Sequence, residues 1–309
     1  MLQEKILRKC NEYHHRLENW MVDRRLLPTH QNYQKFAIIC NIRTGSTMLC
    51  SLLSSHAQAL CFFELFHRHL ESIPFSLPGY QAKSNHPQIV HLRNTDPVSF
   101  LKSEIYKPQK KSIQAVGFKL LYPQARADNP WWNSASFDRW WKDVGREPSW
   151  SGARSDLWAY LQKNTDIAII HLKRENLLES KISAVMAQRT GNWGVGATGG
   201  FGQGQQAIQF ELDFQECLQD FEAHHRMESE ADEFFKNHRK LSITYEDLVR
   251  NTIDTSRRIQ EFLGLELRVL GTQTKKQITQ PLPDLVTNYH QLKAKFANTI
   301  WQDYFKDEF

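Results

Sequence analysis

The sequence lacks the cysteine patterns that hold metal ions or cross-link small secreted domains. Its 309 residues contain five cysteines, with no CxxC pair and no spacing typical of a metal site. Three of them, Cys40, Cys50 and Cys61, stand in apolar runs, where a free cysteine behaves as a small core residue. We therefore expect reduced, structural thiols in a reducing compartment.

Long hydrophobic runs are missing as well. No uninterrupted apolar stretch approaches the roughly 20 residues of a membrane span. The N-terminal sequence MLQEKILRKCNEYHHRLENW has no apolar core of the kind found in signal peptides. We therefore expect a cytoplasmic protein.

Apolar residues recur at helical spacing near the N-terminus: Leu2, Ile6, Cys10, Tyr13, Leu17 and Met21. This pattern predicts an amphipathic helix over residues 2–22 that packs on the surface of the domain. A helix that binds a membrane or a partner is the alternative interpretation.

Extensive basic runs are absent too. The net charge is +5 and the pI is near 8.9, but basic stretches such as KPQKK (107–111) are short. Without a clustered basic and aromatic motif, a nucleic-acid-binding function is disfavoured. A mild positive excess suits a small polyanionic ligand instead.

Short apolar runs alternate with helical segments after residue 30. Strands are expected at FAIIC (36–40), ALCFF (59–63), AVGFKLL (115–121), DIAIIHL (166–172) and LSITYEDL (241–248). Helices are expected at about 46–56, 175–188, 210–238, 255–263 and 283–297. The nearly continuous hydrophobicity of the strands and this alternation predict a doubly wound α/β fold with a parallel sheet. We expect residues 1–30 to form a lead-in and residues 31–309 a single domain.

Two segments depart from this alternation. Residues 127–158 hold six of the nine tryptophans, and the run GNWGVGATGGFGQGQQ (191–206) is dominated by glycine. Tryptophans at 131, 132, 140 and 141 form either part of the core or a stacking platform for an acceptor. The glycine-rich segment is either a disordered insertion or a mobile loop that closes over an active site.

A polar turn, Arg43-Thr44-Gly45-Ser46-Thr47, stands between the first buried strand and a helix. At such a position, free backbone N–H groups and the helix dipole bind anions. Glycine allows close approach of the backbone, the hydroxyls add donors, and arginine supplies a forked positive charge suited to phosphate or sulfate. The turn is therefore a candidate anion site, although a serine-capped helix would use similar residues.

The Walker A pattern GxxxxGK[ST] does not fit this turn. Its first glycine is missing, no lysine precedes the hydroxyl pair, and no predicted strand ends in an acid suited to magnesium. A nucleotide-dependent kinase or ATPase is therefore disfavoured, although it remains an alternative.

The turn resembles the 5′-phosphosulfate loop of sulfotransferases that use 3′-phosphoadenosine 5′-phosphosulfate (PAPS). It is most similar to the RSGST form of bacterial carbohydrate sulfotransferases of the trehalose 2-sulfotransferase type. The resemblance implies a P-loop-like parallel sheet flanked by helices, and a donor site formed by residues 43–48. Met48 stands where cytosolic members have a tryptophan that stacks on adenine, so another group must cover the base.

A second stretch, IIHLKRENLLESKISAVMAQ, resembles the family's 3′-phosphate site. The resemblance implies that Arg174 and Ser183, nine residues apart, bind this phosphate, with Ser180 as the alternative serine. Tyr245 in ITYEDL would lie near the adenine. The segment TKKQITQPLPDLVTNY makes Lys275 and Lys276 available to the 3′-phosphate, although adjacent lysines are usually just solvated.

Glu64 stands 21 residues after Arg43, which is the spacing of the catalytic glutamate in the trehalose enzyme. Its aromatic neighbours Phe63 and Phe66 favour the protonated carboxyl, which suits a general base acting on an alcohol. His67 and His69 are alternative bases. Lys119 lies within an apolar strand that resembles one bordering the acceptor cleft, and there it needs an anionic partner.

The resemblance implies transfer of a sulfuryl group from PAPS to a hydroxyl, releasing 3′,5′-ADP without a metal. Glu64 and Arg43 would be catalytic, and Glu64, Phe66 and Lys119 would line the acceptor site. The acceptor is expected to be a carbohydrate or glycolipid, with lipid alcohols and phenols still open. A non-catalytic partner-binding domain on the same fold is a further alternative, and a homo-oligomer is possible.

Overall fold

The computed structural model describes residues 2–66, 72–75, 77–125, 155–191, 209–272, 274, 278 and 280–305. Its centre is a five-stranded sheet in which every neighbouring pair of strands is parallel. The strands, in spatial order, are β3 (Ala59–Glu64), β5 (Ala115–Leu121), β2 (Gln34–Cys40), β6 (Ala168–Lys173) and β7 (Lys240–Thr244). The predicted parallel α/β fold is therefore confirmed.

The central strand is β2, and the chain builds one half of the sheet after it before it crosses to the other half. Strands β5 and β3 lie on one side of β2, whereas β6 and β7 lie on the other. The strand order therefore reverses at the carboxyl end of β2, and this is where open α/β sheets usually bind ligands. The polar turn predicted as an anion site begins there, at Asn41.

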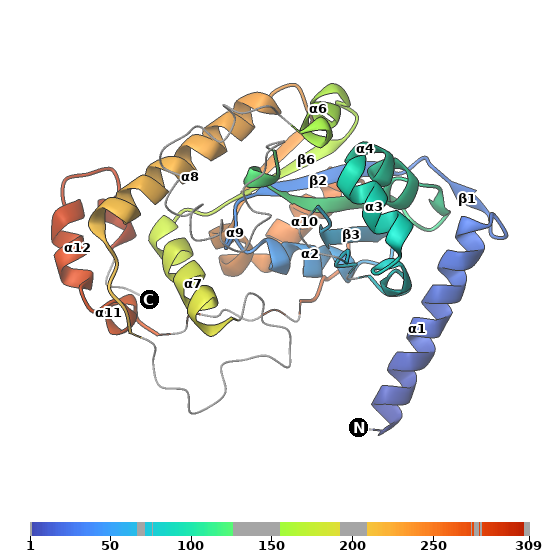
Figure 1. Ribbon diagram of the computed structural model, residues 1–309, viewed down its shortest axis with the longest axis horizontal. Coiled ribbons are helices and arrows are strands. Elements are labelled where there is room, and N and C mark those ends of the chain that lie inside the picture. Colours follow the sequence, from blue (N-terminus) through green and yellow to red (C-terminus); the bar gives the residue numbers. More distant parts are fainter. Residues whose placement is uncertain are drawn as a thin grey trace.

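Helices cover both faces of the sheet (Figure 1). One face packs a large aromatic cluster against α4 (Pro97–Phe100), α6 (Asp156–Lys163) and α8 (Phe214–Phe234). The other face packs against α2 (Ser46–Ser54), α9 (Tyr245–Arg250) and α10 (Thr252–Leu263). Both faces are apolar because parallel strands are buried on each side.

The remaining elements lie around this framework. A third cluster joins α7 (Leu177–Thr190) and α8 to α11 (Leu282–Leu285) and α12 (Tyr289–Phe296). Strands β1 (Thr29–His30) and β4 (Gln109–Lys110) form an antiparallel pair. Helix α3 (Pro87–Thr95) precedes α4, which continues into a π-helical turn over Leu101–Ile105. Helix α1 (Leu2–Asp23) extends away from the sheet (Figure 1).

Two predicted elements differ from the structure. The strand expected over 241–248 ends at Thr244, because the side chains of Thr244 and Asp247 form a capping box that starts α9. The helix expected over 283–297 is two helices, α11 and α12, separated by residues 286–288. In both cases the apolar pattern fits the predicted element as well as the observed one. The local cap or turn decides where the element ends.

The predicted structural role of the cysteines is confirmed where the side chains are described. Cys40, Cys50, Cys61 and Cys217 are free and buried. The tryptophans at 131, 132, 140 and 141 and residues 192–206 of the glycine-rich run lie outside the described residues. Trp158, the last of the tryptophan-rich segment, is fully buried beside Phe234 and Phe235.

A buried hydrogen-bond chain fixes the ends of β5 and β6. The Tyr122 hydroxyl lies 2.5 Å from His171 Nε2, and His171 Nδ1 lies 3.0 Å from an Asp232 carboxylate oxygen. Burial lowers the pKa of His171 despite the nearby Asp232 carboxylate, so the ring is neutral. Because Asp232 can only accept, His171 donates from Nδ1 and accepts the Tyr122 proton at Nε2. The chain joins the two strand ends to α8.

Candidate functional site

The turn between β2 and α2 has the backbone geometry of an open anion site. Arg43 adopts a positive φ of 56° and Gly45 one of 78°. Gly45 is the N-cap of α2, and no side chain accepts a hydrogen bond at this cap. The serine-capped helix that the sequence left open is therefore wrong, and the first N–H groups of α2 have no side-chain cap. The Thr44 hydroxyl instead donates to the Asn41 carbonyl at 2.8 Å.

Gly45 is also required by its contact with Tyr245, the first residue of α9. A Cβ atom added at Gly45 would lie 2.3 Å from Tyr245 Cδ2, well inside van der Waals contact. The tyrosine ring therefore packs directly against the turn. This contact joins the end of β7 to the turn after β2.

We expect Gly45→Ala to destabilise the protein by about 1–3 kcal/mol, because it adds both backbone strain and a clash. Gly264→Ala is the matched control, since Gly264 has φ 68° but nothing within 4 Å of the added Cβ. Chemical denaturation of both variants would isolate the contribution of the Tyr245 contact. An equal loss of unfolding free energy in the two variants would show that the Tyr245 ring can move aside at no measurable cost.

Arg43 lies at the centre of the predicted residues. Its Nε donates to the Ser183 hydroxyl at 2.9 Å, so the turn and helix α7 are in contact. Burial, followed by the neighbouring positive charge of Arg174, lowers the pKa of Arg43 to about 10, against the opposing effects of Glu64 and Tyr245. The guanidinium remains charged at neutral pH, within electrostatic range of both Arg174 and Glu64.

Arg174 follows β6 and is only 7% exposed. Its guanidinium donates to the Arg43 carbonyl at 2.7 Å and stacks over the Tyr245 ring at 4.5 Å. It also pairs with Glu179 at 2.6 Å and lies 3.9 Å from Glu246. The structure thus places Arg174 beside the turn, where two carboxylates lie close to its guanidinium.

The pairing of these two carboxylates with Arg174 was not predicted from the sequence. Glu246 also accepts the backbone N–H of Glu175, so it stabilises the turn between β6 and α7. Glu179 lies in the first turn of α7, where an acid is expected simply from the helix dipole. Only the three-dimensional pairing with Arg174 shows that Glu179 would compete with an anionic ligand.

The two candidate serines on α7 occupy different positions. Ser183 Oγ accepts from Arg43 Nε, whereas Ser180 is 1% exposed and its hydroxyl lies 3.5 Å from the Ile42 carbonyl. Ser183 is therefore the serine in direct contact with an arginine of the turn. Asn176 caps α7, because its side-chain oxygen accepts from the Glu179 N–H.

The other turn residues have distinct surroundings. Ser46 is 5% exposed and hydrogen-bonded with the Cys40 thiol, whose pKa burial raises to about 12. Thr47 is partly exposed. Met48 packs, partly buried, against the cluster beneath α2.

Glu64 reaches Lys119 because of an irregularity in β3. Phe62 pairs with Phe118, but Glu64 pairs with Lys119, so the intervening Phe63 is an extra residue that forms a β-bulge. The Glu64 carboxylate then lies 2.5 Å from Lys119 Nζ, whose side chain is only 4% exposed. Burial would lower the pKa of Lys119, but Glu64 raises it above its usual value. The anionic partner predicted for this buried lysine is therefore Glu64 itself.

Phe66 does not join this group. Its ring is 4% exposed and packs edge-on against Phe100 and Phe118 in the aromatic cluster. The Phe66 side chain, predicted to line the acceptor site, is thus packed in the aromatic core in this structure. The other predicted residues, His67, His69, Lys275 and Lys276, lie outside the described residues.

Two buried donors near the turn have no hydrogen-bond partner in the described part of the chain: Asn41 Nδ2 and Arg174 Nε. Asn41 is 1% exposed, so water does not readily serve it. Unpaired buried donors are costly and usually indicate a missing acceptor. A bound oxyanion supplies acceptors of the kind that these groups lack.

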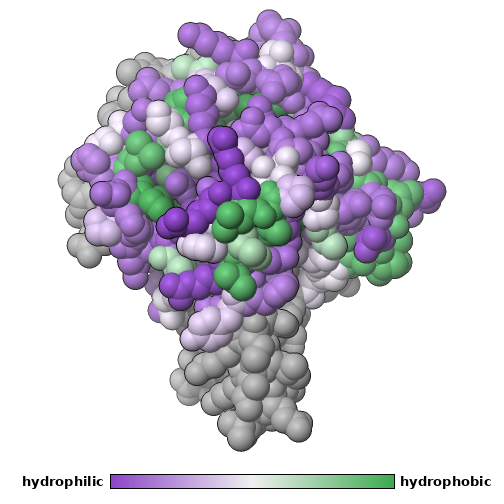
Figure 2. Space-filling view, turned by 90° about the vertical axis from the view of Figure 1, so that its right-hand side faces the viewer, coloured by the Kyte–Doolittle hydropathy of each residue, from purple (hydrophilic) through white to green (hydrophobic). Residues whose placement is uncertain are grey.

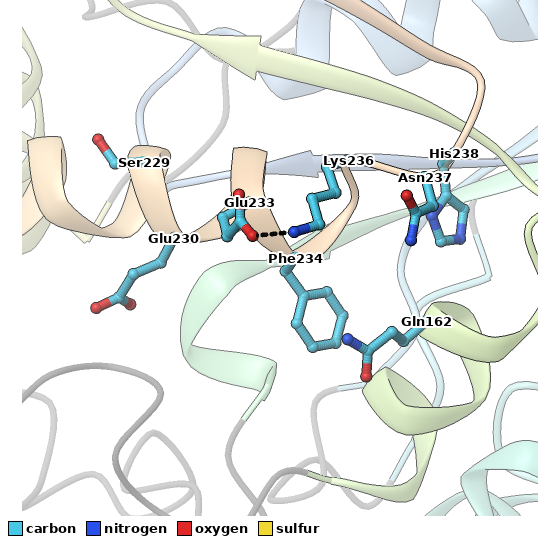
Figure 3. A pocket seen from close by; sticks show the side chains of 8 residues that line it. All are labelled: Gln162, Ser229, Glu230, Glu233, Phe234, Lys236, Asn237 and His238. Atoms are coloured by element: carbon cyan, nitrogen blue, oxygen red, sulfur yellow. Dashed lines mark hydrogen bonds and ion pairs between the residues drawn. The ribbon is translucent and has the colours of Figure 1, made fainter.

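A separate surface pocket lies at the opposite edge of the sheet (Figure 3). It is lined by Gln162, by four residues of α8 (Ser229, Glu230, Glu233 and Phe234) and by residues 236–238, which lead into the amino end of β7. Glu233 pairs there with Lys236 at 2.5 Å, and His238 Nε2 lies 2.9 Å from the Leu161 carbonyl. Because all five strands are parallel, this pocket is remote from the turn.

Among the residues that the structure describes, no three His, Cys, Asp or Glu side chains are grouped so as to hold a metal ion. None of the helices in this part of the chain combines the length and the apolar character needed to cross a membrane.

The parallel sheet and the turn after its central strand define a P-loop-like α/β protein. The chain belongs to the sulfotransferase family, whose family model matches residues 35–268, and it is therefore a transferase of that family. It is similar to nodulation protein H of Rhizobium meliloti strain 1021, with 24% identity over 287 residues that cover 88% of this chain and 95% of that protein. A second nodulation protein H of Rhizobium meliloti is 27% identical over 286 residues, covering 88% and 94% of the two chains.

Among solved structures, the chain is similar to a sulfotransferase from Alicyclobacillus acidocaldarius. The sequence identity is 16% and the TM-score is 0.38, over 89% of this chain and 97% of that one.

Proposed function

We propose that this protein transfers a sulfuryl group from PAPS to a hydroxyl group of a carbohydrate or glycolipid. The observation that carries the proposal is the convergence of two arginines and a helix N-terminus on one turn. Arg174 donates to the carbonyl of Arg43, and Arg43 precedes the uncapped start of α2. Glu64 of β3, which pairs with Lys119 of β5, lies within electrostatic range of Arg43.

In this proposal the turn holds the phosphosulfate end of the donor. Arg43 and the backbone N–H groups of residues 44–48 neutralise the 5′-phosphate, with Ser46 and Thr47 beside them. Arg174 and Ser183 hold the 3′-phosphate, and Tyr245 lies near the adenine. A 3′-phosphate is the feature that separates this donor from ATP.

The chemical step is an in-line displacement at sulfur. The Glu64 carboxylate, which pairs with Lys119, takes the proton of the acceptor hydroxyl. The acceptor oxygen forms a bond to sulfur while the bond between sulfur and the 5′-phosphate oxygen breaks. The electron pair of the broken bond stays on the phosphate oxygen, where Arg43 and the turn stabilise the charge. The products are a sulfate ester and 3′,5′-ADP.

Calorimetry and acceptor screening test the proposal directly. We expect 3′,5′-ADP to bind with measurable heat, and radiolabelled sulfate to move from PAPS to at least one hydroxyl acceptor in a panel of sugars, glycolipids, lipid alcohols and phenols. A kinase would instead bind ATP with magnesium and ignore 3′,5′-ADP. That result would refute the proposal.

Arg174 provides a sharper test because of its pairing with Glu179. We expect Arg174→Ala to weaken binding of 3′,5′-ADP at least about tenfold, in line with the loss of a charged hydrogen bond. Glu179→Gln should leave binding unchanged or tighten it, because it removes a carboxylate that competes with the phosphate for the guanidinium. Calorimetry on both variants, with circular dichroism to verify folding, makes the comparison. Weaker binding in both variants to the same degree would indicate that the pair only supports the turn.

A further inference from the structure

Helix α1 contacts the rest of the protein through its polar side. Glu18 pairs with Lys110 at 3.0 Å, and Asp23 pairs with Lys107 and Lys83. A Cβ added at Gly79 would lie 2.6 Å from both the Asn19 side chain and the His15 carbonyl, so the helix backbone is close to this loop. The residues that contact the domain are therefore 15, 18, 19, 22 and 23, which share one side of the helix.

The opposite side of α1 is apolar and exposed. Tyr13 is 68% exposed, Leu17 54% and Trp20 48%, which is unusual for three large side chains on one stripe. Successive helical residues are about 100° apart, so positions 13, 17 and 20 lie across the helix axis from the contact side. The sequence continues the same four-three spacing to Ile6 and Cys10. The helix is thus amphipathic, as predicted, but its apolar side faces outward.

Acids are confined to one side of the helix. All four of them, Glu4, Glu12, Glu18 and Asp23, occupy positions on the contact half, which also has the basic positions Lys5 and Arg8. The outward half has no acid; it has the basic positions Lys9 and Arg16, and Arg24 directly follows the last helical residue on the same side. The Arg24 guanidinium lies 5.0 Å from the centre of the Trp20 ring, so a cation flanks the apolar stripe directly.

We propose that α1 binds the surface of an anionic lipid bilayer, lying in the plane of the interface. Aromatic and aliphatic side chains beside arginine and lysine are what such helices present to anionic headgroups. A second copy of the chain fits less well, because two outward halves would bring their basic residues together without any acid. On the face of the molecule seen in Figure 2, apolar patches lie directly beside strongly hydrophilic residues. Figure 1 shows the N-terminal part of the helix extending beyond the other elements.

Vesicle co-sedimentation of the full chain tests this proposal without donor or acceptor, so its outcome is independent of the proposed enzymatic function. We expect the protein to sediment with vesicles of equal parts phosphatidylglycerol and phosphatidylcholine. It should bind vesicles of phosphatidylcholine alone at least about tenfold more weakly, and salt should weaken binding to the anionic vesicles. Equal sedimentation with both vesicles would overturn the proposal.

Matched variants locate the binding surface. Leu17→Glu and Trp20→Glu should each reduce binding at least about tenfold, because they place a carboxylate in the apolar stripe. Ile300→Glu introduces the same change at a side chain that is 79% exposed outside α1, and it should have no effect. Arg16→Ala and Arg24→Ala should each reduce binding about fivefold, whereas Arg257→Ala on α10 should not.

Two results would count against the lipid surface. Unchanged sedimentation of Leu17→Glu would show that α1 is not the binding element. The protein could instead bind neither kind of vesicle and form dimers in analytical ultracentrifugation. If Leu17→Glu abolished these dimers, the apolar stripe would be the contact with a second copy of the chain. Because Tyr13, Leu17 and Trp20 are exposed, we expect these variants to fold, and circular dichroism verifies it.

Discussion

Replacement of Glu64 by glutamine is expected to reduce the turnover of sulfate transfer at least about a hundredfold, the usual effect of losing a general base. Glutamine keeps the shape of the side chain and can still accept a hydrogen bond from Lys119, but it cannot take a proton from the acceptor hydroxyl. Binding of 3′,5′-ADP should remain nearly intact, because Glu64 does not hold the donor in the proposed site. Steady-state kinetics with radiolabelled donor and calorimetry with 3′,5′-ADP separate the two effects.

Glu261→Gln is a suitable control for this experiment. Glu261 is 54% exposed on α10 and pairs with Arg257 at 3.4 Å, so the substitution makes the same chemical change at a surface ion pair. We expect it to leave turnover unaltered. A Glu64→Gln enzyme with wild-type turnover would remove this carboxylate from the mechanism.

Arg43→Ala is the second substitution with a large expected effect. In the proposed mechanism Arg43 stabilises charge on the departing 5′-phosphate, and removal of such a group lowers turnover by at least about a hundredfold. Arg43→Lys should recover only part of the activity, because an ammonium group cannot reproduce the forked donors of a guanidinium. Binding of 3′,5′-ADP should weaken in both variants, since the turn loses a partner of the phosphate in the ground state as well.

Stability measurements test whether Arg43→Ala loses turnover simply because the variant is unfolded. Arg43 already adopts a positive φ, and alanine experiences the same backbone strain, so the backbone contribution should change little. Arg257→Ala, at a site where the side chain is 62% exposed, controls for the loss of an arginine. If Arg43→Ala retains full turnover and affinity, the turn cannot be the donor site.

The sheet and the turn could be predicted because each depends on a short, continuous pattern. The apolar run at 36–40 extends only two residues further toward the N-terminus in the structure, and the helix after it begins at Ser46 as expected. Buried parallel strands have to be apolar on both sides, so they are visible without knowledge of their neighbours. The residue types in the turn then predicted an anion site, and that prediction did not depend on the rest of the fold.

The pairings could not be predicted, because they join residues far apart in the sequence. Nothing near Glu179 indicates that it meets Arg174, and the buried chain from Tyr122 through His171 to Asp232 links three separate elements. The orientation of α1 is a similar case. Its spacing specified an apolar side but could not specify that ion pairs from Glu18 and Asp23 would fix the other side against the domain.

The single extra residue in β3 has a consequence for comparing this chain with its relatives. Side chains alternate along a strand, so a carboxylate two places after Phe62 would ordinarily follow it into the aromatic cluster. Because Phe63 is an extra residue in the bulge, Glu64 points to the opposite side of the sheet from Phe62. The direction of the acid is therefore set by the number of residues between the two positions. Matched residue by residue with a regular strand that has no bulge, Glu64 would fall on a core position, although it pairs here with Lys119.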